Sequence, residues 1–214
     1  LWIILSSASF AADQTTVLGR VYSFKDLALP SSIQTRGRSI LASPIRLETD
    51  AAWDASDLKL TTHSDDEAIY VTDMKRDAVE LKVHTRLEFD GFMTVDLALS
   101  GTGIFKKLDL VIPLKEEHAK LLQNYTMAPG PGKATGRFHG EIPNDGYTSP
   151  PFITTWIGTD HYGLEFSCES SRGWSMAKPN EAISVTREPG KVVLRIKFIS
   201  RPIHLTDHPR RIRF

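Results

Sequence analysis

The sequence contains a single cysteine, Cys168, among 214 residues. One cysteine allows no internal disulfide bond and no zinc site built on cysteine ligands. This composition is compatible with the cytosol and with a bacterial exported protein. Because Cys168 alternates with the apolar Leu164 and Phe166, we expect its side chain to be buried as a small hydrophobic group.

The chain also has no excess of either charge, because 26 lysine and arginine residues balance 26 aspartate and glutamate residues. A neutral chain has no general electrostatic attraction to nucleic acid or to an anionic membrane, so we expect neither as a partner. No apolar run approaches the length of a membrane-spanning helix. The hydrophobic fraction of 41% is large enough to support a folded core.

The first residues have a composition of their own. Leu1 to Ala12 combines an apolar start with small residues before Asp13, which is similar to the end of a signal peptide but lacks its basic start. An opening strand or a linker from a preceding domain is the favoured interpretation. We therefore predict a strand or linker over residues 1–14 and a single β-sandwich domain over 15–214, as a fragment of a larger multidomain protein. Export to the periplasm or the exterior is favoured over a cytoplasmic location.

Alternation of apolar and polar residues is the dominant pattern. It is clearest in the runs 81–89 and 93–99, which flank the turn pair Asp90-Gly91 and predict a β-hairpin with one buried face. A third long alternating run covers 191–200. With about a dozen such runs at short spacings, the sequence predicts an all-β fold, a large antiparallel two-sheet β-sandwich of the supersandwich type.

One segment departs from this pattern. Leu114, His118, Leu121 and Tyr125 recur at helical spacing, and acidic residues stand at the start of the segment, where a helix favours them. We therefore predict one short helix near residues 115–125.

The segment 151–174 carries two of the four tryptophans and the only cysteine. It is predicted to form two strands, 152–157 and 164–168, around a polar, glycine-rich turn. An exposed indole face could stack on a sugar ring, whereas a buried one would pack in the core or dock on another domain. The candidate carbohydrate-binding residues are Trp156, Asp160, His161, Glu165, Arg172 and Trp174.

The carboxylates of this segment do not form a catalytic pair in the sequence. Glu165 and Glu169 are four residues apart on one strand, or about 13 Å by the rise per residue. Retaining glycosidases hold their two carboxylates about 5 Å apart. We therefore assign no catalytic residue, and we expect a buried Glu169 to form a structural ion pair with Arg172.

No metal or cofactor site is predicted. His204 and His208 are four residues apart, a spacing that suits a shared metal ion only on a helix. Pro202 and Pro209 flank the pair and make a helix there improbable.

Four stretches carry a family resemblance: Thr-Val-Leu-Gly-Arg at 16–20 with 27–30; Leu-Glu-Phe-Asp-Gly-Phe-Met at 87–93; Ile-Pro-Leu-Lys-Glu-Glu at 112–117; and Trp-Ile-Gly at 156–158 with Gly-Leu-Glu-Phe at 163–166 and Glu-Ser-Ser-Arg-Gly-Trp at 169–174. The ending, 209–214, looks like the exit from the same domain. Together they resemble the N-terminal, non-catalytic domain of proteins similar to family 123 glycoside hydrolases, the β-N-acetylgalactosaminidase-like group. The resemblance implies a β-sandwich that precedes a (β/α)₈ barrel in the polypeptide. The barrel would hold the catalytic Asp and Glu, so no catalytic residue is carried over to this chain.

Three functional hypotheses follow. The first is a non-catalytic accessory domain of a carbohydrate-active protein, whose partner is the catalytic domain of the same polypeptide, a glycoside hydrolase. The second is a stand-alone carbohydrate-binding module, whose partner is a glycan. The third is a mutarotase- or lyase-like sandwich enzyme that uses His84, Arg86 or His161 with Glu165.

Overall fold

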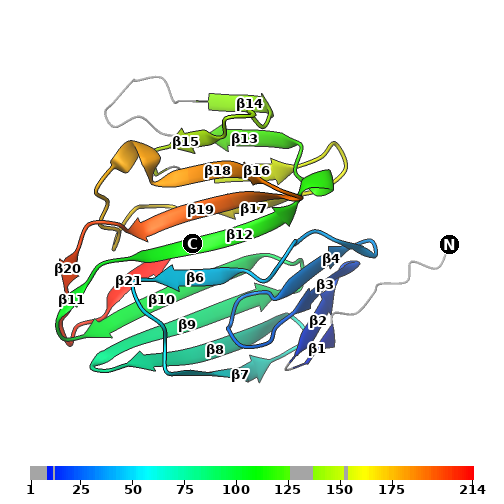
Figure 1. Cartoon of the computed structure of the whole chain (residues 1–214). Helices are drawn as coiled ribbons and strands as arrows, with labels where there is room; N and C mark the ends of the chain where they lie inside the picture. The colour runs from blue at the N-terminus through cyan, green and yellow to red at the C-terminus, as the bar shows by residue number, and fades with distance from the viewer. Residues whose placement is uncertain (1–8, 12, 126–136, 152–153) are drawn as a thin grey trace.

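The computed structural model describes residues 9–11, 13–125, 137–151 and 154–214. Antiparallel β-structure dominates it (Figure 1), and the described helical residues form two short 3₁₀ turns, η1 (Glu116–His118) and η2 (Pro179–Glu181). The all-β sandwich predicted from the alternating pattern is thereby confirmed. No helix in these ranges is long and apolar enough to cross a membrane.

The N-terminal sheet holds five short strands that follow one another in chain order. It packs on the neighbouring sheet through the stacked rings of Phe24 and Tyr70, whose centroids are 3.9 Å apart. The Tyr70 hydroxyl also lies 2.6 Å from the Thr15 hydroxyl. The strands are β1 (Ser9–Phe10), β2 (Gln14–Val17), β3 (Arg20–Ser23), β4 (Ser32–Thr35) and β5 (Arg38–Ser39).

The lower sheet of Figure 1 has the order β21-β10-β9-β8-β7 and contains the predicted long hairpin. Burial alternates along β9 with a period of two, so that Leu81, Val83 and Leu87 face the core. Gly91 takes a φ of +84° in the turn between β9 and β10, a conformation that glycine adopts without strain. The strands are β7 (Ala55–His63), β8 (Glu67–Arg76), β9 (Val79–Glu88), β10 (Met93–Gly101) and β21 (Arg210–Arg213).

The central sheet has the order β15-β18-β19-β12-β6. Its inner strand β12, which pairs with β19 and β6, is buried on both faces from Leu108 to Leu114, as its largely apolar sequence favours. The strands β11 (Ile104–Phe105) and β20 (Ile203–His204) pair with each other in a separate two-stranded ribbon. The strands of the central sheet are β6 (Arg46–Thr49), β12 (Leu108–Lys115), β15 (Tyr147–Ser149), β18 (Ile183–Glu188) and β19 (Lys191–Ile199).

The predicted helix near 115–125 is wrong. After the single turn of η1, the chain forms β13 (Leu121–Tyr125), which pairs with strands on both sides. Leu122 and Asn124 are buried and Gln123 and Tyr125 are exposed, a period of two. Over so few residues a helical period and a strand period share most apolar positions, and two hydrogen-bonded ladders outweigh the weak helical propensity.

The upper sheet has the order β14-β13-β16-β17. It contains the second predicted hairpin, in which Trp156 pairs with Glu165 and Gly158 with Gly163. The first strand of that hairpin is described from Thr154 onward. The remaining strands are β14 (Arg137–Glu141), β16 (Thr154–Gly158) and β17 (Gly163–Ser167).

Candidate binding cleft

Two adjoining cavities lie where the edge of the upper sheet meets the edge of the lower sheet. β17 and β21 are the edge strands of these sheets among the described strands. Phe92, Ser167 and Phe214 line both cavities, so the cavities form one cleft. We call the cavity of about 890 Å³ the arginine cavity and that of about 720 Å³ the apolar cavity.

The turn between β9 and β10 forms one wall of the apolar cavity, and two side chains of β3 hold it. Arg20 donates from Nη1 to the Asp90 carbonyl oxygen at 2.5 Å, and the Tyr22 hydroxyl donates to the Gly91 carbonyl oxygen at 3.2 Å. A side chain at Gly91 would meet the Tyr22 hydroxyl at 2.9 Å. A larger residue at position 91 would therefore displace these two side chains, while the positive φ of the turn itself favours glycine. Asp90 is the turn residue that the sequence predicted.

The apolar cavity combines a buried apolar lining with a polar rim. Ile33, Leu110 and Phe166 are buried at its surface. The predicted residues His161 and Glu165 also line it, and both are exposed. This mixture of apolar surface and a few polar groups is typical of small-molecule and domain-contact sites.

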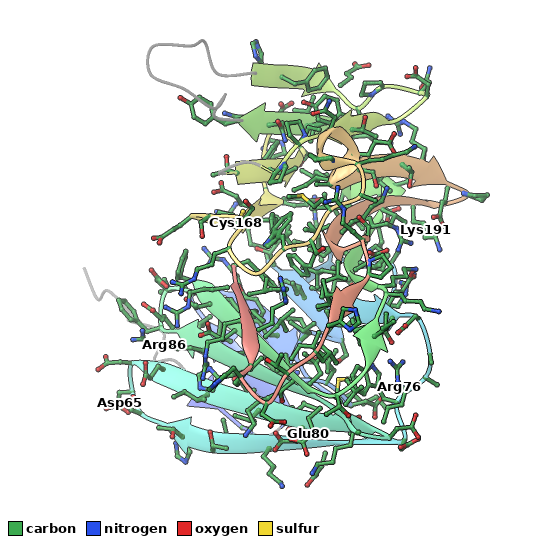
Figure 2. All side chains as sticks on the ribbon, turned by 90° about the vertical axis from the view of Figure 1, so that its left-hand side faces the viewer. Asp65, Arg76, Glu80, Arg86, Cys168 and Lys191 are labelled. Atoms are coloured by element: carbon green, nitrogen blue, oxygen red, sulfur yellow. The ribbon has the colours of Figure 1, made fainter. Side chains whose placement is uncertain are left out.

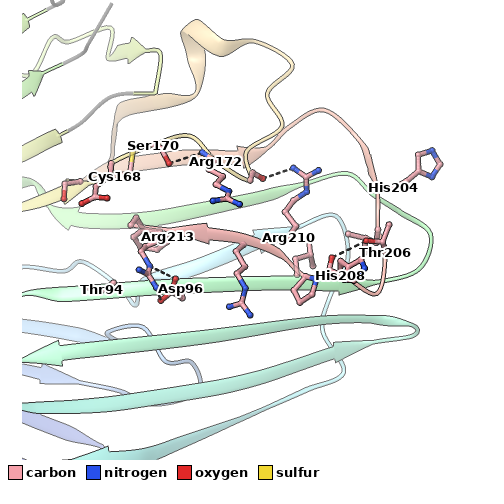
Figure 3. A pocket seen from close by; sticks show the side chains of 18 of the residues that line it. Thr94, Asp96, Cys168, Ser170, Arg172, His204, Thr206, His208, Arg210 and Arg213 are labelled. Carbon is pink, nitrogen blue, oxygen red and sulfur yellow. Dashed lines mark hydrogen bonds and ion pairs between the residues drawn. The ribbon is translucent and has the colours of Figure 1, made fainter. Parts of the chain in front are cut away.

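The arginine cavity is named for the four arginines that line it, Arg172, Arg210, Arg211 and Arg213. Arg210 donates to the Gly173 carbonyl oxygen at 3.0 Å, which ties β21 to the segment after β17. Arg213 makes a two-pronged ion pair with Asp96, with N···O distances of 2.7 and 2.9 Å (Figure 3). These two arginines are therefore held in place by the fold.

Cys168 lies between the cleft and the core, near the middle of the molecule in Figure 2. Its side chain is buried, as the sequence predicted, and burial raises the pKa of its thiol to about 11. The thiol is therefore protonated at neutral pH, which is the state of an unreactive cysteine.

The two tryptophans proposed for sugar contact have different surroundings. Trp174 is only 8% exposed and packs edge-on against Phe198, with ring centroids 4.9 Å apart. The structure thus places Trp174 in the core, the alternative that the sequence left open. Trp156 is partly exposed on the outer face of β16, and its ring covers Gly158 and Gly163. Neither tryptophan lines the two cavities.

Of the other predicted residues, Asp160 is exposed in the turn before β17 and lines neither cavity, whereas Arg172 lines the arginine cavity. The expected ion pair of a buried Glu169 with Arg172 is wrong. Both residues are exposed, and no ion pair joins them among the described residues. The chain turns after β17, so the two side chains do not share one strand face.

The residues of the third hypothesis converge only in part. His84 and Arg86 belong to β9 of the lower sheet, where Arg86 pairs with Glu67. Figure 2 shows Arg86 on that sheet, below Cys168. His161 and Glu165 lie at the edge of the upper sheet. The structure therefore brings His161 and Glu165 to the same cavity but leaves His84 and Arg86 on a different sheet.

A charged cluster on the central sheet was not foreseen from the sequence. Arg195 donates from Nη1 to Glu48 at 2.6 Å and to Asp109 at 3.0 Å, and Lys107 lies 3.1 Å from Glu48. The hydrogen bond from Arg195 lowers the pKa of Glu48 to about 2, while burial raises the pKa of Asp109. These residues come from three strands and from the loop before β12. Their proximity follows only from the pairing of β6, β12 and β19, which the sequence does not show.

The cluster lines neither cavity of the cleft, and both of its carboxylates are engaged by the same arginine. Its geometry is that of a structural ion network. Among the described residues, no group of three or more histidine, cysteine, aspartate or glutamate side chains is arranged to hold a metal ion.

The family model described as "Glycoside hydrolase 123, third domain" matches residues 9–175. The matched description names a third domain, whereas the sequence resemblance pointed to an N-terminal one. No curated protein matches the chain.

Proposed function

Because the chain belongs to the glycoside hydrolase 123 third-domain family, we propose that it is a non-catalytic accessory domain that supports the catalytic domain of the same polypeptide. The family description carries this proposal, since it presents the chain as one unit of a glycoside hydrolase with several domains. Family membership alone does not fix a role, because sandwich domains occur with many activities.

The mouth of the apolar cavity offers a contact surface for this role. Leu18 and Phe92 line this cavity and are 54% and 58% exposed, and Phe89 in the same turn is 53% exposed. Large apolar side chains gathered at one place on a surface mark interaction sites. The bonds from Arg20 and Tyr22 hold the turn in a fixed position, which favours a rigid contact. The catalytic domain is the occupant that we propose for this surface.

The test uses the polypeptide that contains this domain, with Phe89 and Phe92 both replaced by serine. We expect the catalytic domain to unfold at a lower temperature. We also expect it to retain less of its activity toward an aryl β-N-acetylgalactosaminide after heating. The 214-residue chain carrying the same substitutions should keep its own unfolding midpoint, because both rings are exposed.

Ile104→Ser is the matched control, since Ile104 is 56% exposed and lines neither cavity. It should leave both domains unchanged. If complete removal of this domain left the unfolding and the heat resistance of the catalytic domain unaltered, the supporting role would be refuted.

A further inference from the structure

The arginine cavity carries a local excess of positive charge on a chain whose net charge is zero. Four arginines line it against two carboxylates, Asp96 and Glu169, which leaves a formal excess of two positive charges. His204 and His208 also line it. A concave surface lined by one sign of charge concentrates ligands of the opposite sign.

Two of the four arginines are not engaged by the fold. Arg210 and Arg213 are bound to Gly173 and Asp96, but the described residues supply no hydrogen-bond or ion-pair partner to the guanidinium groups of Arg172 and Arg211. Figure 3 shows the side chain of Arg172 extending from the segment after β17 toward β21. A guanidinium group presents a fork of N–H donors that matches the oxygens of a carboxylate or a sulfate.

The rest of the lining suits hydroxyl groups. Thr94, Ser167, Ser170 and Thr206 line the same cavity, and each hydroxyl can both donate and accept hydrogen bonds. The volume of about 890 Å³ lies in the range of small-molecule sites and exceeds what a lone inorganic anion needs. Positive charge beside hydroxyl groups in a cavity of this size fits a sugar that carries acidic groups.

We infer that the arginine cavity binds an anionic saccharide, that is, an oligosaccharide bearing carboxylate or sulfate groups, through Arg172 and Arg211. The choice of a saccharide rests on the proposed place of the chain in a carbohydrate-active protein. The acidic character of the ligand rests on the arginines themselves. Arg210 and Arg213 position the wall of the cavity, while the two unengaged arginines contact the ligand.

Titration calorimetry on the 214-residue chain tests this inference with four probes. A hyaluronan hexasaccharide carries carboxylates only, a κ-carrageenan hexasaccharide carries sulfates only, chitohexaose is neutral, and sodium sulfate is the anion without the sugar. We expect at least one anionic hexasaccharide to bind and to weaken with added salt. Chitohexaose and sodium sulfate should bind far more weakly. The first two probes distinguish carboxylate from sulfate recognition.

Arg172→Gln and Arg211→Gln should each weaken binding about tenfold, the loss typical of one charged hydrogen bond. Arg201→Gln is the matched control, because Arg201 is exposed and lines neither cavity. It removes the same charge and should leave the affinity unchanged. Since Arg172 and Arg211 are exposed, both variants should fold normally, which the unfolding midpoint verifies.

Three outcomes would overturn the inference. They are no binding of either anionic hexasaccharide, equal loss in the Arg201→Gln control, and sodium sulfate or chitohexaose binding as tightly as the anionic hexasaccharides. Because the titration uses this chain alone, a negative result refutes the proposed saccharide binding but leaves the proposed supporting role untouched. That role stands or falls with the heat resistance of the catalytic domain.

Discussion

The indole ring of Trp156 on β16 lies over Gly163 of the adjacent strand β17. A methyl group on Gly163 would be 2.5 Å from ring carbon Cζ2 of Trp156, well inside van der Waals contact. One face of the ring is therefore covered by the backbone of its own sheet. An aromatic ring laid across glycines in this way shields backbone that has no side chain of its own.

The first prediction concerns this contact. Gly163→Ala should lower the free energy of unfolding by about 1–3 kcal/mol, because the new methyl group displaces the indole. In a Trp156→Ala background the same change should lower the free energy of unfolding much less. Urea denaturation of the wild type, the two single variants and the double variant gives the difference as a coupling energy.

Gly158→Ala provides the comparison within the same hairpin. A methyl group there would also meet the backbone, at 2.6 Å from the Gly163 Cα atom. Its cost should persist when Trp156 is removed. If Trp156→Ala reduced the destabilisation by both glycine substitutions equally, the indole ring alone would cause the clash at both positions. That result would contradict the backbone contact at Gly158.

The second prediction concerns the charged cluster. Arg195→Met should destabilise the protein by about 3–5 kcal/mol, because it leaves the Asp109 carboxylate, which is 6% exposed, without its nearest cation. Removal of Lys178 from its exposed pair with Glu181 should cost less than about 1 kcal/mol. Guanidinium denaturation of the two variants measures the contrast, and similar values for both would contradict the burial of the cluster.

The third prediction is a dependence of stability on pH. Since the pKa of Glu48 is lowered from 4.5 to about 2, its ionised form stabilises the folded state above about pH 4.5, and this stabilisation is lost as the pH falls toward 2. Asp109 acts in the opposite direction, because burial raises its pKa. Glu48→Gln should therefore destabilise the protein at pH 7, because it removes the ionised partner of Arg195.

The difference between wild type and Glu48→Gln isolates the Glu48 contribution. It should shrink as the pH falls from about 4.5 to 2, when unfolding free energies are measured across that interval. A difference that stayed constant with pH would mean that Glu48 has no shifted pKa.

The fourth prediction concerns Cys168. Its raised pKa and its burial should make the native thiol react slowly with a disulfide reagent at pH 8, whereas the unfolded chain should react at the rate of a simple thiol. Absorbance of the released thiolate gives both rates. Fast labelling of the native protein would contradict the burial of this side chain.

The hairpins could be predicted because their information is local. Asp90-Gly91 and the alternating runs on either side specify the turn and the buried face, and the structure confirms both. The segment 115–125 could not be predicted, because its apolar spacing fits two periods and the decision comes from β14 and β16, which are distant in sequence.

The cleft was predictable only in part, for the same reason. His161, Glu165 and Arg172 lie in one hairpin region that the sequence singled out, and all three line the cleft. The opposite wall comes from β10 and β21, and no local pattern indicates that β21 returns to the edge of the lower sheet. The three arginines of β21 were therefore overlooked as part of a site.

The position of these arginines has a consequence for the chain in concentrated solution. β21 is an edge strand whose side chains are Arg210, Arg211, Ile212 and Arg213. A second molecule adding its own β21 there would bring like charges together and would desolvate them. The arginines of β21 thus oppose the edge-to-edge strand pairing that leads to fibrils, although the backbone of the strand is extended.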